Sequence, residues 1–230
     1  MRQEFLSNVS HELRTPLTAI LAFVETLEAG ALDDRENSQR FLSIIRKNAA
    51  RMQNLIDDIL ELNAIEAGNV RVKAEEIELN PLINDVIMSL AAKASSRGIM
   101  VSNHVPPGAV VFVDPRRLEQ MLTNLVDNAI KFNRDGGRVT IGWEAGARSR
   151  ILVHDTGEGI PVQHLERLFE RFYRVDRARS REMGGTGLGL AIVKHLARAH
   201  GGEVRVSSEL GQGSTFEIDL PLANGLRGNA

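Results

Sequence analysis

The sequence predicts two domains: an all-α antiparallel helical hairpin that pairs with a second copy into a dimeric four-helix bundle, then an α+β sandwich. Two observations predict this division. Apolar residues recur at steps of three and four through the first part of the chain, and short apolar strands alternate with helices after it. The expected limits are residues 1–66 for the hairpin, 67–73 for a hinge, 74–223 for the sandwich and 224–230 for a frayed tail.

The composition excludes several classes of protein. The 230 residues carry a formal net charge of -2, which gives no sign of a nucleic-acid or membrane-surface partner. The chain has no cysteine, so disulfides and cysteine metal sites are excluded. No run of residues approaches the roughly 18 to 20 apolar positions of a membrane-spanning helix. The sequence therefore predicts a chain without a membrane segment of its own.

Each helix of the hairpin has an apolar stripe. Gly30 ends the first helix, Leu32–Asp34 forms a turn, and Gly68 ends the second helix. The stripes are Leu6, Val9, Leu13, Leu17, Ile20, Val24 and Leu27, and Phe41, Ile45, Asn48, Met52, Leu55, Ile59 and Leu62. Asn48 either fixes the register of the bundle or marks a solvated end. Further apolar residues exceed what one helix can cover and predict the dimer: Leu42, Ile44, Ile56, Leu60 and Ile65.

The second part of the chain mixes strands and helices, with most strands joined as hairpins. Asp114 and Pro115 open a helix as N-cap and first helical residue. The predicted strands are one or two within 70–79, then 99–105, 110–113, 138–144 and 150–155, and two around 211–213. The predicted helices are 81–97, 115–132, 161–172 and 187–200, with a charged loop over 173–186.

The first helix contains a histidine with an unusual setting. His11 lies about 160° around the helix from both Val9 and Leu13, so its imidazole faces solvent and can meet a phosphate. Glu12 follows it, and a carboxylate there can hold one ring proton and leave the other nitrogen nucleophilic. Thr15 lies one turn further on the same face, and Pro16 should bend the helix. Taken alone, an exposed histidine is most often only solvated.

Three downstream clusters suit a nucleotide. Asn124, Asn128 and Lys131 fall within about 60° on one strip of the helix that begins after Asp114, where amides and an amine suit a cation and phosphate oxygens. Asp155 follows an apolar strand, and the carboxylate can accept a hydrogen bond from the amine of adenine. Such a strip or turn is, by itself, most often ordinary surface.

The third cluster is the glycine-rich run from Gly184 to Leu190, which opens a helix. Backbone amides at a helix start bind anions. The run is not a P-loop, because no Gly-Lys-Ser/Thr follows at the required spacing, and it is not the dinucleotide fingerprint, because no strand precedes it. Three clusters in one order behind the histidine helix predict a nucleotide-dependent activity.

Together these motifs resemble the transmitter region of sensor histidine kinases, a histidine-bearing dimerisation domain followed by an ATPase domain of the gyrase/Hsp90/MutL type (Bergerat or GHKL fold). The likeness covers residues 1 to about 222. His11–Pro16 resembles the H box, Asn124–Lys131 the N box and Asp155–Gly159 the G1 box. Phe169–Phe172 resembles the F box and Gly185–Gly189 the G2 box, while 172–176 and the stretch to His200 resemble the phosphate-responsive subgroup.

The resemblance implies a role for each site residue. His11 would accept the phosphoryl group, Glu12 would activate it, and Thr15 would orient water when a phosphorylated partner is dephosphorylated. Asn128 would ligate Mg²⁺, and Arg174 would reach the γ-phosphate of ATP. Phe132 stands where the family often has tyrosine. The remaining implied ATP-binding residues are Asn124, Lys131, Asp155, Gly157, Gly159, Gly185, Thr186, Gly187, Leu188 and Gly189.

The implied function is autophosphorylation from ATP, then phosphotransfer to an aspartate of a response regulator, with phosphatase activity toward that regulator. Cofactors would be ATP and Mg²⁺, and partners a second copy and a receiver domain. The chain would be the cytoplasmic part of a membrane-anchored parent, with 173–184 as a mobile lid. Two alternatives stay open: an ATP-driven conformational machine of the same nucleotide fold, and a pseudokinase scaffold. The other five histidines are expected to be structural or exposed.

Overall fold

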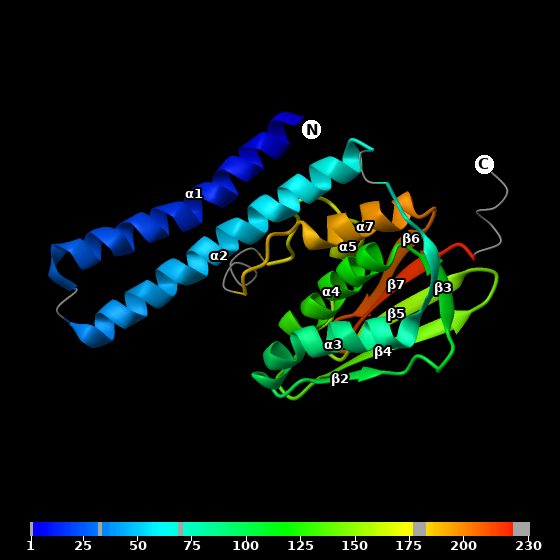
Figure 1. The fold of residues 1–230 in the computed structure, drawn as a ribbon. Helices are drawn as coiled ribbons and strands as arrows, with labels where there is room; N and C mark the ends of the chain where they lie inside the picture. Colours follow the sequence, from blue (N-terminus) through cyan, green and yellow to red (C-terminus); the bar gives the residue numbers. More distant parts are fainter. Residues whose placement is uncertain (1, 32–33, 69–70, 177–182, 223–230) are drawn as a thin grey trace.

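The computed structural model describes residues 2–31, 34–68, 71–176 and 183–222, with side chains from Phe5 onward. Figure 1 shows a long two-helix hairpin that lies beside a layered domain of helices and strands. The expected turn at 32–33, part of the hinge, the middle of the lid and the tail from 223 lie outside the described residues. Within the described part of the chain, no helix has the length and apolarity needed to cross a membrane.

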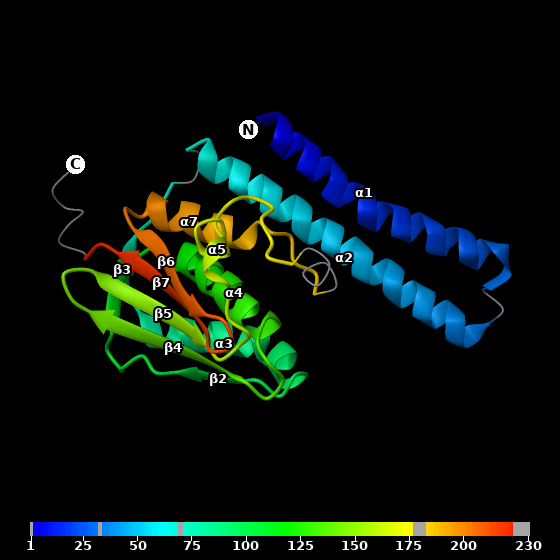
Figure 2. The same cartoon turned by 180° about the vertical axis from the view of Figure 1, so that it is seen from behind.

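The hairpin consists of α1 (Arg2–Thr26), a π-helical turn η1 (Leu27–Ala31) and α2 (Arg35–Glu66). Gly30 has a φ of 117° and so breaks the helix where the sequence predicts an end. Asp34 caps α2, because its carboxylate accepts the backbone N–H groups of Glu36 and Asn37 at 3.2 and 3.1 Å. Pro16 lies inside α1, and Figures 1 and 2 both show α1 changing direction along its length.

The apolar residues of the hairpin face three surroundings. Phe23 of α1 contacts Phe41 of α2, with ring centroids 5.3 Å apart. Leu55, Leu62 and Ile65 belong to a buried core that also contains residues of the second domain, and Val9 and Leu13 of α1 pack against the same core. Periodicity marks the apolar face of α2 without saying that the second domain helps to cover it. Still exposed in the single chain are Leu6, Leu17, Leu21, Leu42, Ile56 and Leu60.

Asn48 does not contact α1 through any hydrogen bond in the described residues. Its amide donates to the carbonyl of Ile44 in its own helix at 2.9 Å.

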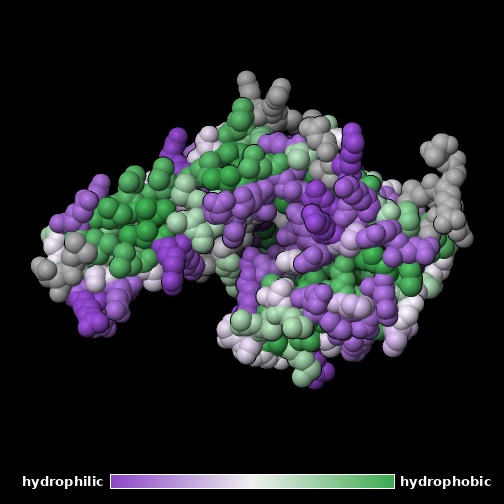
Figure 3. Space-filling model, in the orientation of Figure 1, coloured by the Kyte–Doolittle hydropathy of each residue, from purple (hydrophilic) through white to green (hydrophobic). Residues whose placement is uncertain are grey.

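Figure 3 shows hydrophobic residues along the hairpin surface and hydrophilic residues around a hollow between the hairpin and the second domain.

Two sheets organise the second domain. β1 (Glu75–Glu78) pairs antiparallel with β3 (Val110–Val113) in a small sheet. The larger sheet has the order β2-β4-β5-β7-β6 and comprises Met100–Asn103, Arg138–Ala145, Ser149–Asp155, Gly213–Leu220 and Glu203–Glu209. β2 pairs parallel with β4, whereas the pairs β4–β5, β5–β7 and β6–β7 are antiparallel. The sheet is therefore mixed, which the hairpin-rich pattern did not predict for β2.

Helices cover one face of the larger sheet and leave the other face open (Figure 2). They are α3 (Leu79–Ser95), α4 (Pro115–Lys131) and α7 (Gly189–Ala199), with the short α5 (Val162–Leu165) near the sheet edge. β5 alternates buried and more exposed residues, as a strand with one covered face must. The core-facing stripe of α4 is fully buried: Leu118, Met121, Leu122, Leu125, Val126, Ala129 and Ile130.

The observed bounds differ from the predicted ones most clearly in two regions. The strand region ends at Glu78, and Leu79 already belongs to α3. The helix predicted over 161–172 is only four residues long. The chain beyond it forms separate turns, each closed by a hydrogen bond between residues three positions apart, such as that from the Leu168 N–H to the Leu165 carbonyl. Phe172 ends this segment with a φ of 61°, a conformation that no helix continues.

Asp114 caps α4 as predicted. Its carboxylate accepts the N–H groups of Arg116 and Arg117, and also that of Lys73 at 3.0 Å. The buried His200 accepts the N–H of Asp114 on Nε2 at 3.2 Å, while its Nδ1 bonds the Leu196 carbonyl at 2.8 Å. This pairing requires the neutral tautomer with the proton on Nδ1, and burial lowers the pKa of His200 accordingly. His200 is thus structural.

Candidate nucleotide-binding site

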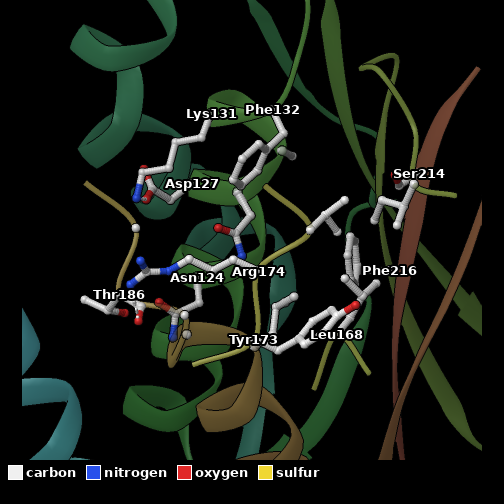
Figure 4. A pocket seen from close by; sticks show the side chains of 18 of the residues that line it. Asn124, Asp127, Lys131, Phe132, Leu168, Tyr173, Arg174, Thr186, Ser214 and Phe216 are labelled. Atoms are coloured by element: carbon white, nitrogen blue, oxygen red, sulfur yellow. Dashed lines mark hydrogen bonds and ion pairs between the residues drawn. The ribbon is translucent and has the colours of Figure 1, made fainter. Parts of the chain in front are cut away.

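A cavity of about 510 Å³ lies among α2, α4, the end of β5, β7 and the glycine-rich loop. Figure 4 shows side chains of these elements directed into it. Its lining includes most of the predicted nucleotide residues: Asn124, Asn128, Lys131, Phe132, Asp155, Gly159, Arg174, Gly185, Thr186, Gly187 and Gly189. Segments more than sixty residues apart in sequence therefore meet at one site.

One end of the cavity is built around Asp155, the last residue of β5. Its carboxylate accepts the N–H of Gly157 at 2.8 Å and is only 6% exposed. Burial raises the pKa of Asp155, although hydrogen bonds from Gly157 and Ser214 oppose the shift. Gly157 does not line the cavity but supports this carboxylate from behind. The Asp155 carboxylate is thus a buried hydrogen-bond acceptor at the cavity, and it can accept an N–H group of a ligand.

Gly159 is required by the close approach of the β6–β7 turn. It has a φ of +70°, and a Cβ there would lie 2.0 Å from the carbonyl oxygen of Glu209. The backbone is therefore locked against this turn, and its neighbour Ile160 donates its N–H to Ser208 Oγ at 2.8 Å. Apolar side chains complete the wall at this end: Ile160, Leu168 and Phe216.

Asp127 of α4 also lines the cavity and was not among the predicted site residues. Asp127 accepts a salt bridge from Lys131 of the next turn at 2.7 Å and another from Lys93 of α3. Burial alone would raise the pKa of Asp127, but the charges and hydrogen bonds of the two lysines lower it. Lys131, predicted to meet phosphates, is held by Asp127 in this structure (Figure 4). Helical arithmetic places Asp127 about 40° beyond the edge of the strip predicted on α4, so the sequence contained part of that signal.

The glycine-rich loop contacts the other domain of the same chain. Thr186 donates its hydroxyl to Asp58 of α2 at 2.6 Å and accepts the N–H of Leu188 at 3.2 Å. Burial raises the pKa of Asp58, opposed by the bond from Thr186 and the charge of Lys131. Asn54 and Asp57 line the same end of the cavity. None of these three was predicted, because no local pattern tells where α2 docks.

Gly187 allows the loop to pass against the F-box segment. It has a φ of +76°, and a Cβ would lie 2.9 Å from the Cα of Phe172. Phe172 in turn donates its N–H to the Gly187 carbonyl at 2.8 Å and contacts the ring of Phe5 in α1. The predicted binding residue Leu188 does not line the cavity: its side chain is completely buried in the core. The side chain of Leu188 therefore packs in the core, and any part that Leu188 takes in binding falls to its backbone.

Arg174 joins the two domains. Its guanidinium is 4% exposed, donates from Nη2 to Glu12 of α1 at 2.8 Å and to the Thr186 carbonyl at 2.7 Å. Glu12 also accepts Arg51 of α2 at 3.2 Å. Among the described residues, the buried Nε of Arg174 has no hydrogen-bond partner. A donor beside the cavity is thus available for an anion.

His11 is exposed and does not line the cavity. Thr15, one turn on, is also exposed and donates to the His11 carbonyl at 3.2 Å. Further ion pairs hold α2 against the second domain, between Glu61 and Arg117 and between Glu66 and Arg171. In this arrangement the predicted acceptor and the predicted nucleotide site lie on one molecule but are not joined in one pocket.

Two family models match the chain. The His Kinase A (phospho-acceptor) domain matches residues 1–68, and the histidine kinase-, DNA gyrase B- and HSP90-like ATPase matches residues 113–224. A sensor protein kinase WalK of Staphylococcus saprophyticus is 40% identical over 224 residues, which are 96% of this chain and 36% of the relative. The chain therefore spans about a third of the length of the curated relatives it matches.

Solved structures agree. Full-length ShkA in complex with AMPPNP is 31% identical with a TM-score of 0.71, over 96% of this chain and 46% of that one. Histidine kinase ThkA in complex with the response regulator protein TrrA is 26% identical with a TM-score of 0.78, over 97% and 63% of the two chains. The shared folds, the two domain matches and the 40% identity show that the chain belongs to the sensor histidine kinases and is their transmitter region.

Proposed function

We propose that this chain transfers the γ-phosphoryl group of ATP to His11 and passes it on to an aspartate of a response regulator. One observation carries the proposal: a single cavity joins Asn128, Asp155 and the Gly185–Gly189 loop, behind a helix that exposes His11. The ATPase family match and the AMPPNP bound by ShkA support ATP as the nucleotide. The regulator bound by ThkA supports the acceptor class.

At the base end, Asp155 would accept the exocyclic amine of adenine. Guanine presents a carbonyl at that position, which a carboxylate repels, so the site would favour ATP over GTP. The acceptor must be ionised, and its raised pKa means that binding weakens as the pH falls toward that pKa. Phe132, 39% exposed at the end of α4, lines the same cavity and offers a ring without a hydroxyl.

At the phosphate end, the amides of the glycine-rich loop, the start of α7 and Asn124 would bind the triphosphate. Lys131 would exchange Asp127 for a phosphate oxygen, and Arg174 has a free Nε for the γ-phosphate. The exchange at Lys131 replaces a carboxylate partner by a phosphate, which conserves the charge pairing of the lysine.

The chain offers a fitting donor for Mg²⁺. Asn128 lines the cavity, and its side-chain amide oxygen can serve as a ligand, since Mg²⁺ takes few protein ligands and keeps phosphate and water oxygens. No group of three or more His, Cys, Asp or Glu residues within the described ranges forms a metal site, so the donor set suits a cation held mainly by the nucleotide. When bound, the ion would neutralise charge on the triphosphate.

The transfer step forms a bond between a nitrogen of His11 and the γ-phosphorus, and breaks the bond from that phosphorus to the β–γ bridging oxygen, so that ADP leaves. Glu12 would hold the proton of the other ring nitrogen. Because His11 does not line the cavity, the contacts of Glu12 with Arg174 and of Asp58 with Thr186 must open first. The connection at 67–73 would act as the hinge between residues 1–66 and 74–223.

The exposed leucines and isoleucines of the hairpin would be covered by a second copy in a four-helix bundle. Thr15, exposed beside His11, would orient water for dephosphorylation of the regulator. We further propose a cytoplasmic position in a membrane-anchored parent. The likeness of 172–176 to phosphate-responsive kinases rests on sequence alone, while the relatives found at about 40% identity are named WalK.

Labelling with radioactive ATP tests the proposal. The parent protein with Mg²⁺ should acquire acid-labile, alkali-stable label, and His11→Gln and Asn128→Ala should acquire none. ATP hydrolysis without labelled protein would instead favour the conformational machine. Failure to bind ATP at all would favour the pseudokinase scaffold.

A further inference from the structure

Tyr173 is the chain's single tyrosine, and its ring lines the nucleotide cavity. It lies where the F-box segment meets the loop that leads to the glycine-rich run. Figure 4 shows it beside Leu168, on the side of the cavity that Phe216 also lines and across from Lys131. The ring packs against the hydrophobic core but keeps a cavity-facing surface. The sequence motifs place Tyr173 only at the start of the expected lid over 173–184 and give it no contact with the nucleotide.

Three contacts hold this ring. The hydroxyl of Tyr173 lies 2.6 Å from Nδ1 of His164 in α5. The guanidinium of Arg167 lies 4.4 Å from the ring centroid, on a face of the ring. Its backbone N–H donates to the Glu170 carbonyl at 3.3 Å. Glu170 also fixes Arg167, accepting its Nε at 3.2 Å and its Nη2 at 3.0 Å.

The arrangement separates Tyr173 from the residue that follows it. Arg174 is tied to Glu12 of α1, a contact that the proposed phosphoryl transfer requires to open. Among the described residues, the hydrogen bonds of Tyr173 run to His164 of α5 and to Glu170 in the turn after it. Its ring therefore stays in the cavity wall when Arg174 changes partners. A fixed aromatic face next to apolar side chains suits the flat, uncharged part of a nucleotide.

We propose that Tyr173 contacts the nucleoside part of the bound nucleotide, and that His164 is a positioning residue that holds its ring in place. The proposal rests on the proposed function and deepens it. It explains why the wall carries a tyrosine where a phenylalanine would fill the same space: the hydroxyl anchors the ring outside the cavity. His164, expected from the sequence to be merely structural or exposed, thereby acts on the site through Tyr173.

Steady-state labelling of His11 at varied ATP tests the pair. Tyr173→Phe and His164→Leu should each raise KM for ATP about fivefold, which corresponds to roughly 1 kcal/mol, with kcat within about twofold. The double variant should match the single variants, because both remove one interaction. Tyr173→Ala should raise KM further, about tenfold or more. His104→Leu is the matched control, an exposed histidine outside the cavity, and should leave both constants unchanged.

The single tyrosine also gives a direct signal. With tyrosine labelled for NMR, Mg²⁺-ATP should shift the ring resonances of Tyr173, and Mg²⁺-tripolyphosphate should not, because it lacks the nucleoside. Equal shifts with both ligands, or a parental KM in Tyr173→Ala, would overturn the inference. In either case label on His11 of the parent would show that the proposed function still stands, whereas an unlabelled parent would contradict that function instead.

Discussion

The two ends of the nucleotide cavity are built in different ways. The base end is made within one domain: Asp155 ends a central strand, and Gly159 is locked onto the β6–β7 turn. The phosphate end is made between two domains, since Thr186 bonds Asp58 and Arg174 bonds Glu12. At the base end the acceptor, Asp155, is in place without any other domain. At the phosphate end the cationic groups, Lys131 and Arg174, are already paired with carboxylates of the chain itself.

This difference suits the proposed phosphoryl transfer, in which the second domain would have to move relative to the hairpin. A base end that depends only on its own sheet keeps its shape wherever the domain lies. A phosphate end whose arginine and threonine bind the histidine domain links nucleotide binding to the contact between domains. The contacts of Arg174 and Thr186 with the first domain would compete with the triphosphate. Because binding free energies are coupled reciprocally, ATP would weaken these contacts by the same factor by which they weaken ATP binding.

The largest effect is expected at the base end. Asp155→Asn replaces the acceptor of the adenine amine by an amide and leaves that amine without a charged partner. ATP affinity measured by calorimetry should fall about 100-fold or more. Asp85→Asn, at an exposed carboxylate of α3 outside this cavity, is the control and should bind ATP as the parent does. Parental affinity in Asp155→Asn, with an unchanged melting temperature, would remove Asp155 from the site.

A smaller effect of opposite sign is expected at the phosphate end. Asp58→Asn removes a buried negative charge from the space expected to hold the triphosphate, and it weakens the hold on Thr186. ATP should bind roughly three- to tenfold more tightly. Glu61→Gln is the matched control, since it breaks the contact with Arg117 without lining the cavity. If both variants tighten ATP equally, domain contact alone is responsible; weaker binding in Asp58→Asn would contradict the competition.

The same substitution should change the pH dependence of stability. Burial raises the pKa of Asp58, so its contribution to stability is fully present below the unfolded value of 3.8 and is lost as pH rises through the folded pKa. At pH 7 the ionised group therefore costs stability that the neutral asparagine does not. Asp58→Asn should melt at a higher temperature than the parent at pH 7, with the gap narrowing in acid; a lower melting temperature at pH 7 would contradict this.

The smallest effect is expected at the helix that serves both ends. Asp114→Ala removes the cap of α4 and should cost about 1 kcal/mol of unfolding free energy in a denaturant titration. Burial alone would raise the pKa of Asp114, but the N–H groups of Lys73, Arg117 and Arg116 lower it. Its contribution is present above 3.8 and is lost as pH falls through the lowered folded pKa. The stabilities of variant and parent should therefore converge in acid.

The sequence-based predictions divide in the same way, between features made within one domain and features made between two domains. Local chemistry predicted the cap at Asp114, the break at Gly30 and the strip on α4, because each depends on neighbours in the chain. It also predicted that Asp155 and the glycine-rich loop belong to one site. Burial of Leu188 was missed, because a glycine-rich motif does not say which of its residues faces the core.

Contacts between domains were beyond reach. Leu55, Leu62 and Ile65 were recognised as apolar, but their packing in one core with residues of the second domain was not predicted. Asp58 looked like any charge on a helix, because its bond to Thr186 joins residues that lie 128 positions apart. The parallel pairing of β2 with β4 joins strands that are not neighbours in the sequence, and periodicity does not encode such a pairing.

Locating the phosphate on the protein tests the central claim most directly. After incubation of the purified chain with Mg²⁺ and ATP, mass spectrometry under neutral conditions should find phosphohistidine at His11 and at no other histidine. Phosphate on another residue, or an unmodified His11 in a protein that binds ATP, would contradict the account.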